Sequence, residues 1–246
     1  MMISRKTRAH LGLAVVAAAA FAVTSAAKAD VIAQWTFENS PLTSTATTVA
    51  ANTPFTNEGP ETGSGSAIGY HLTATAYSAP AGNGSPKSFS SNAWSVGDYY
   101  EFDVSTAAYT GVSLSFDQTG SATGPAQFKV QYNAGSGWLD LASGAYTIPN
   151  TTTTASAGTT SIAWNTSGAA NTATSFTFDL SSISGLTGIR LVDNGTTPIG
   201  TSSAVGTGGT SRVDNVTFTG TSSVPEPATA AIAAVGAAFM IGRRRR

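Results

Sequence analysis

The chain has 246 residues, no cysteine and only 10% charged residues. Eight of its 12 basic side chains lie in the first 28 or the last four residues, so the body between them carries four basic against 12 acidic side chains, a net charge of −8. That sign excludes a nucleic-acid-binding surface and a basic face for anionic lipid, and the lack of cysteine excludes disulfides and cysteine nucleophiles.

Residues 1–29 have the three-part layout of a secretory signal peptide. Three basic side chains within residues 5–8 precede an apolar run, and the segment closes on the A-x-A-like site of Ala27 and Ala29. This order of charge, apolar run and small residues is typical of an export signal and not of a buried core helix. Cleavage after Ala29 would make Asp30 the first residue of the mature protein.

Residues 30–220 are predicted to form one all-β domain, a jelly-roll-like β-sandwich. Apolar and polar residues alternate over short segments separated by Gly, Asn and Ser, and no segment of the body shows a helical period with capping signals. In 111–117, for example, Val112, Leu114 and Phe116 fall on one face, which the strand buries against an opposing sheet. The predicted strands are 31–38, 71–77, 99–104, 111–117, 126–132, 175–180, 188–193 and 212–220.

Between these strands, four segments are low in large apolar residues and rich in Gly, Ser, Thr or Ala. Such composition predicts long loops. The remaining length, roughly 195 residues once both ends are removed, is enough for one domain with a packed core. The predicted loops are 43–66, 80–92, 150–161 and 195–211.

Residues 221–246 form a separate C-terminal unit. An uncharged run of 15 residues, 228–242, would span roughly 22 Å as a helix, against about 30 Å for a bilayer core, and so predicts a marginal, temporary membrane anchor. The positive-inside bias places the terminal arginines in the cytoplasm and the body of the protein outside. The parts of the unit are a linker, the motif Val224, Pro225, Glu226 and Pro227, the apolar run, and Arg243, Arg244, Arg245 and Arg246.

This tail resembles the PEP-CTERM sorting signal of Gram-negative bacteria, because the Pro-Glu-Pro motif, the short apolar helix and the arginine cluster occur in that order at the extreme C-terminus. In that family the motif is recognised by exosortase, a membrane-embedded cysteine protease that removes the tail as the protein passes to the cell surface or extracellular matrix. The resemblance implies an exported protein, anchored in the inner membrane before processing, in a bacterium that makes exopolysaccharide. It says nothing about the chemistry of the body.

The first and last predicted strands carry a second resemblance. IAQWTFE and RVDNVTFTG are similar to the terminal strands of jelly-roll domains in PEP-CTERM proteins and in concanavalin-like or carbohydrate-binding sandwiches. The resemblance implies that the two strands lie side by side, and it points to glycan binding. If the two strands are neighbours, oxygens of Glu38 and Asn39 approach those of Asp214 and Asn215. Such a set of oxygens suits a structural calcium ion. Bonds of Asp214 and Asn215 to nearby backbone are the alternative.

Catalytic residues are scarce in the body. His71 is its only histidine, which excludes multi-histidine metal sites, and no G-x-S-x-G motif accompanies it for a Ser-His-Asp triad, so we interpret His71 as a structural residue. Glycosidases place two carboxylates roughly 5–10 Å apart. No local motif singles out such a pair here, and solvated strand faces and turn caps are the simpler interpretation. The candidate carboxylates are Asp98, Glu101, Asp103, Asp117, Asp140 and Asp179.

The tryptophans offer planar rings on which sugars can stack. Trp35, within an alternating strand, is expected in the core. Trp138, in the glycine-flanked turn GSGWLD, and Trp94, in SNAWSVGDYY, are the glycan-binding candidates, with core packing as the alternative for each.

We therefore expect a non-catalytic surface or extracellular-matrix protein that exosortase processes and that associates with exopolysaccharide. Two alternatives stay open: a secreted polysaccharide-degrading enzyme that uses paired carboxylates, and a structural adhesin without sugar binding. Turnover of a matrix glycan that is lost on changing one acid would identify the enzyme, and the absence of sugar affinity would favour the adhesin.

Overall fold

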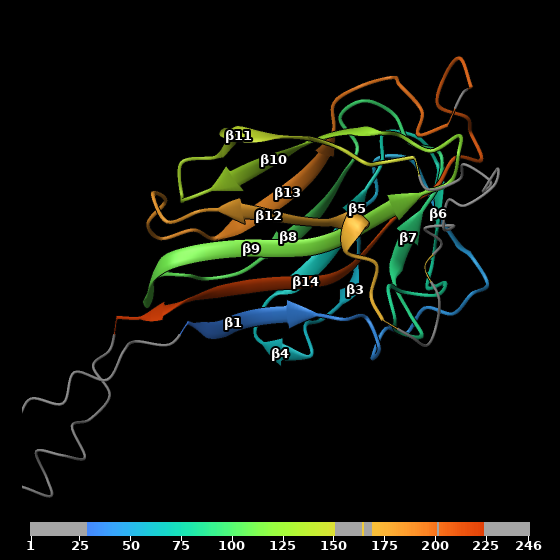
Figure 1. Cartoon of the computed structure of the whole chain (residues 1–246). Coiled ribbons are helices and arrows are strands. Elements are labelled where there is room, and N and C mark those ends of the chain that lie inside the picture. Colours follow the sequence, from blue (N-terminus) through green and yellow to red (C-terminus); the bar gives the residue numbers. More distant parts are fainter. Residues whose placement is uncertain (1–28, 151–163, 165–168, 201, 224–246) are drawn as a thin grey trace, which may run out of the picture.

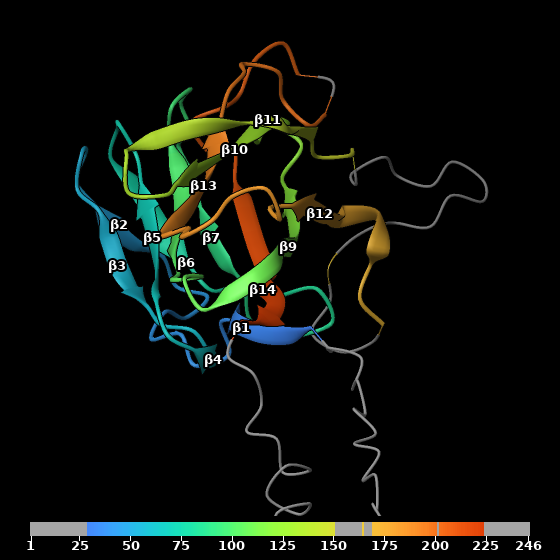
Figure 2. The same ribbon diagram turned by 90° about the vertical axis from the view of Figure 1, so that its left-hand side faces the viewer.

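The computed structural model describes residues 29–150, 164, 169–200 and 202–223, so the predicted signal peptide and sorting tail lie outside it. Within the described residues the chain is all β, apart from one short 3-10 helix, η1 (Thr172–Thr174). The strands form two antiparallel sheets that face each other, in agreement with the predicted β-sandwich (Figures 1 and 2). The described part contains no helix with the length and apolar character that crossing a membrane requires.

The larger sheet has eight strands. Its main path runs β12-β9-β14-β7-β6-β2, and β1 pairs with both β14 and β4. Every pairing in it is antiparallel. The strands are β1 (Asp30–Trp35), β2 (Thr47–Val49), β4 (Thr62–Gly63), β6 (Thr75–Ser78), β7 (Phe89–Ser91), β9 (Tyr109–Gly120), β12 (Ser175–Asp179) and β14 (Ser211–Ser222).

The smaller sheet has six strands in the order β11-β10-β13-β8-β5-β3. Its central strands, β13 and β8, pair along the whole of β8, so the positions that point outward on one strand are aligned with those on the next. The strands are β3 (Phe55–Glu58), β5 (Ser66–Tyr70), β8 (Tyr99–Asp103), β10 (Gln127–Asn133), β11 (Trp138–Thr147) and β13 (Gly188–Asp193).

The first and last strands of the domain pair with each other, as predicted. In this antiparallel pair Asp30 lies opposite Gly220 and Trp35 opposite Val216. Both ends of the domain therefore leave the sandwich on the same side, at the left of Figure 1. Because β14 has 12 residues, at about 3.4 Å each it carries the chain roughly 40 Å from the far end of the sandwich to this exit.

The core lies between the two sheets and is rich in aromatic rings. Val112, Leu114 and Phe116 of β9 are all at most 2% exposed, so the predicted alternation of this strand is confirmed. Trp35 is fully buried as expected and meets the ring of Phe102 edge-on, with the centroids 5.4 Å apart. Burying each such large side chain contributes roughly 1.5–3 kcal/mol to stability.

Several strands were not predicted. Segment 43–66, expected to be a loop, contains β2, β3 and β4, and segment 80–92 contains β7. The expected strand 71–77 begins only at Thr75, because residues 71–74 turn into β6. The missed strands β2 and β3 lie at sheet edges and β4 pairs only with β1, so backbone pairing and not an alternating apolar face forms them. The predicted loop 150–161 lies outside the described residues except for Asn150.

Candidate functional site

A row of planar side chains lies on the outer face of the six-stranded sheet. We call Tyr70, Tyr99, Arg190 and Trp138 the planar stack. The rings of Tyr70 and Tyr99 are stacked, with centroids 5.0 Å apart. The guanidinium carbon of Arg190 lies 3.9 Å from the centroid of Tyr99 and 4.0 Å from that of Trp138. Each member comes from a different strand, β5, β8, β13 and β11, and each is partly exposed.

Strand alternation and register place these groups together. Tyr100 and Phe102 of β8 are fully buried. Because side chains alternate along a strand, their neighbours Tyr99 and Glu101 point outward. Glu101 lies opposite Arg190 of β13 in the antiparallel register. Gly188, next along this face of β13, leaves room for the Trp138 ring, because a Cβ there would lie 3.1 Å from Cη2 of Trp138.

Hydrogen bonds fix the charged centre of the stack. Nε of Arg190 donates to Oε2 of Glu101 at 2.6 Å, and Nη2 donates to the hydroxyl of Tyr99 at 3.0 Å. Burial raises the pKa of Glu101, and the Arg190 charge opposes this rise. A guanidinium held over aromatic faces adds about 0.5–1 kcal/mol at partly exposed sites. The stack is therefore held in one geometry before any ligand arrives.

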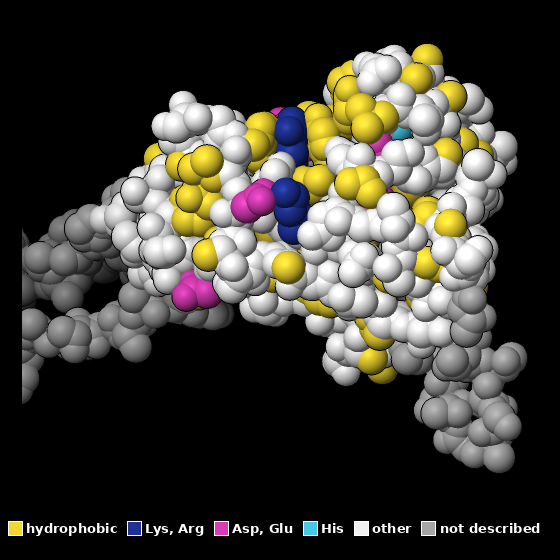
Figure 3. Space-filling view, turned by 90° about the horizontal axis from the view of Figure 1, so that it is seen from above, with side chains coloured by type: hydrophobic (Ala, Val, Ile, Leu, Met, Phe, Trp, Pro, Cys, Tyr) yellow, Lys and Arg dark blue, Asp and Glu magenta, His cyan; other side chains and the backbone are white. Residues whose placement is uncertain are grey.

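Polar side chains extend the same face beyond the stack. Lys129 and Gln131 of β10 both donate to the carboxylate of Asp140 on β11, at 2.9 and 2.8 Å. Figure 3 looks onto this side of the molecule and shows basic side chains in a row between hydrophobic ones, with acidic side chains beside them. From β5 to β11 the face spans five strands, about 19 Å at the usual spacing. An extended ligand lying across the strands would meet both rings and hydrogen-bonding groups.

The two tryptophans predicted to bind glycan occupy different environments. Trp138 lies at the surface in the planar stack. Trp94 is only 5% exposed, and its ring contacts those of His71, Tyr100 and Phe128, with centroids 4.6, 5.0 and 5.4 Å away. Core side chains thus enclose the ring of Trp94, and a sugar cannot stack on it. Only Trp138 keeps the surface position that the prediction needs.

Of the four residues predicted to bind calcium, Glu38 and Asp214 contact one loop, residues 82–88, and the four do not converge. Oε1 of Glu38 accepts from the backbone N–H of Lys87 at 3.1 Å, whereas Oδ2 of Asp214 accepts from that of Asn83 at 2.8 Å and from Ser85 Oγ at 2.9 Å. Asn39 and Asn215 bond elsewhere, the backbone N–H of Asn39 to Glu61 and the amide of Asn215 to Asp117.

The surroundings of Asp214 bear on this metal prediction. Burial raises the pKa of Asp214 to about 7. A Cβ added at Gly82 would lie 2.1–2.4 Å from Lys87 O, Ser85 Oγ and Asp214 Oδ2, so three oxygens face one point. Among the described residues, however, no three His, Asp or Glu side chains gather as a metal-binding group. Calcium binding stays a prediction, and the loop contacts of Asp214 fit the alternative of bonds to nearby backbone.

His71 belongs to a buried polar network. Its Nδ1 lies 2.9 Å from Asp98 Oδ2, an ion-pair distance without hydrogen-bond geometry, and its Nε2 lies 2.9 Å from Ser91 Oγ. The order of these groups is that of a catalytic triad, but all three are at most 1% exposed. Ser91 is further tied to Tyr100, whose hydroxyl donates to the carbonyl of Ser211 at 2.7 Å. The network joins the two sheets in the core, which agrees with a structural role for His71.

The candidate carboxylates are mostly separated. Glu101 and Asp103 alternate along β8 and share the face of the planar stack, where Asp103 accepts from Ser66 Oγ at 2.8 Å. Asp179 accepts from the backbone N–H of Ser181 in a turn, and Asp140 is bound by Lys129 and Gln131. Asp98 and Asp117 are buried. Of the six, therefore, Glu101, Asp103 and Asp140 reach the candidate binding face, and of these Glu101 and Asp103 lie on the same strand, β8.

Fold and site together describe an all-β sandwich domain whose last strand leads directly into the C-terminal tail. This tail defines the class, because a sequence model of the PEP-CTERM protein-sorting motif matches residues 223–246. The chain is thus an exported protein with an exosortase sorting signal, anchored by its C-terminus before processing. The resemblance predicted for the tail is confirmed. A search of curated proteins finds no match to the chain.

Proposed function

We propose that this protein is a non-catalytic component of the cell surface or extracellular matrix that binds exopolysaccharide through the planar stack. The observation that carries the proposal is the stack itself, in which three aromatic rings and one guanidinium from four strands form a continuous, prearranged surface. The pairing of β1 with β14 supports the finer description of the domain as a jelly roll.

The chemistry of this face suits a polysaccharide. Aromatic rings bury the apolar C–H surface of sugars, while Lys129, Gln131 and Asp140 offer hydrogen-bonding groups beside them. The face is open and extends over several strands, so it accommodates a chain and not only a single sugar. The Arg190 bond to Glu101 and the burial of the His71 network support a binding role over a catalytic one.

Replacing Trp138 by alanine is expected to weaken binding of residues 30–223 to polysaccharide from the native host by about tenfold or more, because one stacking partner is lost. Affinity is measured by calorimetry with and without calcium. The matched control is Leu139→Ala, which removes a neighbouring side chain that is 51% exposed and leaves the stack intact. Equal affinity of the Trp138 and Leu139 variants would contradict the proposed surface.

The same experiment separates the two alternatives. Release of reducing sugar is followed in parallel, and none is expected. Release that stops in a Glu101→Gln variant would favour a hydrolase that uses Glu101 and Asp103, which lie on the same strand of this face. Failure of the unaltered domain to bind any host polysaccharide would favour the structural adhesin.

The sorting signal gives a prediction in the native host. Changing Pro225 and Glu226 to alanine is expected to leave export unaffected and to prevent removal of the tail, because exosortase recognises the motif at these residues. An immunoblot should then show the longer, uncut chain in the inner-membrane fraction. A double alanine change at Thr221 and Ser222, just outside the matched motif, is the control and should be cut normally. Normal cutting of the Pro225 and Glu226 variant would refute exosortase sorting through this motif.

A further inference from the structure

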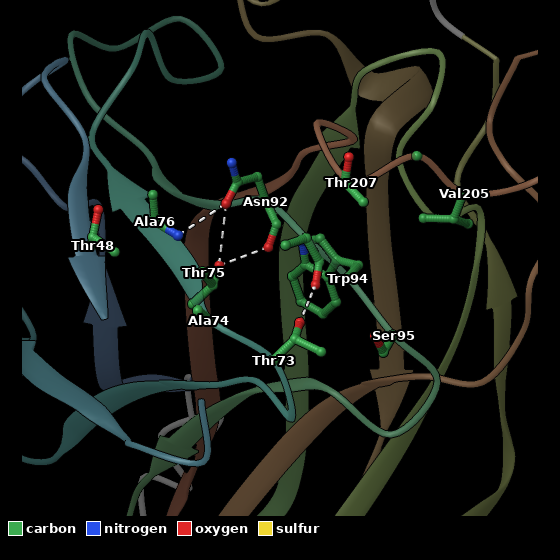
Figure 4. A pocket seen from close by; sticks show the side chains of 12 residues that line it. Thr48, Thr73, Ala74, Thr75, Ala76, Asn92, Trp94, Ser95, Val205 and Thr207 are labelled. Carbon is green, nitrogen blue, oxygen red and sulfur yellow. Dashed lines mark hydrogen bonds between the residues drawn. The ribbon is translucent and has the colours of Figure 1, made fainter. Parts of the chain in front are cut away.

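A pocket of about 770 Å³ lies away from the planar stack. It opens between β2, β6, the segment that follows β7 and the loop before β14 (Figure 4). Since that loop precedes Ser211, the pocket is near the start of β14, roughly 40 Å of strand away from the exit of the tail. None of the residues that line the pocket is charged, and no member of the planar stack is among them.

The pocket contains free hydrogen-bonding groups. The hydroxyls of Thr48, Ser95 and Thr207 line it and make no hydrogen bond within the described part of the chain. Oδ1 of Asn92 accepts from the backbone N–H of Ala76 at 2.9 Å, which fixes the amide plane. The Nδ2 of Asn92 has no such partner and points away from β6 (Figure 4). Three hydroxyls and one amide donor are therefore available to a ligand.

The floor of the pocket is rigid. Trp94 lines the pocket although it is only 5% exposed, and its Nε1 donates to the carbonyl of Ser91 at 3.1 Å. Ala93 has a φ of 56°, a left-handed conformation that costs an alanine on the order of 1 kcal/mol and persists only where its surroundings enforce it. The hydroxyl of Thr73 donates a hydrogen bond to the carbonyl of Ala93 at 3.2 Å. The pocket is thus built in advance of ligand binding.

We propose that this pocket binds one neutral sugar unit, such as the end or a branch of a polysaccharide. Hydroxyl groups act both as donors and as acceptors, as the hydroxyls of a sugar require, and the methyl groups of Ala74 and Ala76 and the side chain of Val205 offer contacts to its C–H surface. The absence of charged lining residues favours a neutral sugar over a uronic acid or a sugar phosphate. The inference rests on the proposed function only for the source of the sugar, because the site itself is separate from the planar stack.

The test uses the full chain in a detergent without a sugar headgroup. The probes are glucose, galactose, mannose and N-acetylglucosamine, with glucuronate as the charged comparison, and binding is followed by saturation-transfer NMR titration. At least one neutral sugar is expected to bind with a dissociation constant of about 1 mM, and glucuronate more weakly. Binding of none of the neutral sugars, or equal binding of glucuronate, would overturn the proposal.

Matched variants locate the site. Thr48→Val removes a hydroxyl that lines the pocket at nearly constant shape, whereas Thr47→Val changes the adjacent exposed residue of β2, which does not line it. Asn92→Asp keeps the Oδ1 that accepts from the backbone N–H of Ala76 in β6, and it removes the Nδ2 donor. Thr48→Val and Asn92→Asp are each expected to weaken sugar binding by roughly fivefold, and Thr47→Val to leave it unchanged. Identical behaviour of the Thr47 and Thr48 variants would contradict the proposed site.

Trp138→Ala separates the two proposals. If the pocket binds a neutral sugar, this variant keeps that affinity while losing affinity for the long polysaccharide. Loss of polysaccharide binding only in the pocket variants would overturn the planar-stack proposal and leave the pocket as the binding site. If Trp138→Ala loses affinity for the neutral sugar and for the polysaccharide while the pocket variants keep both, the pocket proposal is overturned.

Discussion

The free energy of unfolding of residues 30–223 is expected to fall by several kcal/mol as the pH rises from about 5 to about 8. Three buried carboxyl groups, Glu58, Asp193 and Asp214, cause this effect. Burial raises the pKa of Glu58 from 4.5 to about 7 and the pKa values of Asp193 and Asp214 from 3.8 to about 7 in the folded protein. Glu58 is 2% exposed and accepts from Ser40 Oγ at 2.6 Å, while Asp193 is 1% exposed.

The direction of the effect follows from the two pKa values of each group. A carboxyl whose pKa is higher in the folded state binds its proton more tightly there, so it stabilises the fold fully below the unfolded pKa, near 4. This stabilisation is lost as the pH rises through about 7, where the folded protein must hold a buried charge. One pKa unit corresponds to about 1.4 kcal/mol, so each group accounts for roughly 3 kcal/mol between about pH 5 and pH 7.

Urea denaturation at several pH values measures this change. Hydrogen bonds lower the pKa of Asp140 and of Asp179, and the stability from these groups is lost only as the pH falls below the range of the test. The control is the double variant Glu58→Gln and Asp193→Asn, in which only the smaller pH dependence due to Asp214 should remain. A stability that stays constant or increases between about pH 5 and 8 in the unaltered domain would show that these carboxylates ionise without penalty.

The strands that the sequence predicted are those that bury one face. β8, β9, β10, β12, β13 and β14 each alternate between buried and more exposed residues or carry a clear apolar run, and all six lie close to the predicted ranges. Most of the missed strands lack this pattern, and β5, which does alternate, buries only the small residues Ala67 and Gly69. β11, for example, has a single fully buried position among its ten residues, Gly144, and is held by pairing with β10. Such pairing depends on distant backbone, which no local pattern reveals.

The candidate site was predictable only in part. Trp138 was identified from its glycine-flanked turn, but Arg190 and Tyr70 were not, because their meeting depends on the register of β5, β8 and β13. The one local signal was an arginine at an outward position of the apolar segment GIRLVD. Trp94 shows the opposite limit. Its sequence surroundings resemble a loop, yet Tyr100 and Phe128 enclose its ring.

Replacing Gly69 by alanine is expected to destabilise the domain by about 3 kcal/mol or more, because the added methyl group overlaps a buried ring. Gly69 lies in β5 and is buried. Its Cβ would fall 2.2 Å from Cε1 and 2.6 Å from Cζ of Tyr77. Tyr77 is fully buried and stacks against Phe55 and Phe89, with centroids 4.8 and 5.4 Å away, so its ring has no space into which to move.

Urea denaturation of residues 30–223 at one pH measures the loss. Gly59→Ala is the matched control, since a Cβ there meets no atom within 4 Å and the residue has no left-handed φ. We expect it to change stability by no more than about 0.5 kcal/mol. Adding Tyr77→Leu to Gly69→Ala should recover part of the loss, because the smaller side chain removes the overlap. A Gly69→Ala variant as stable as Gly59→Ala would mean that the two sheets separate easily at this point, which would contradict the close packing of Tyr77 between them.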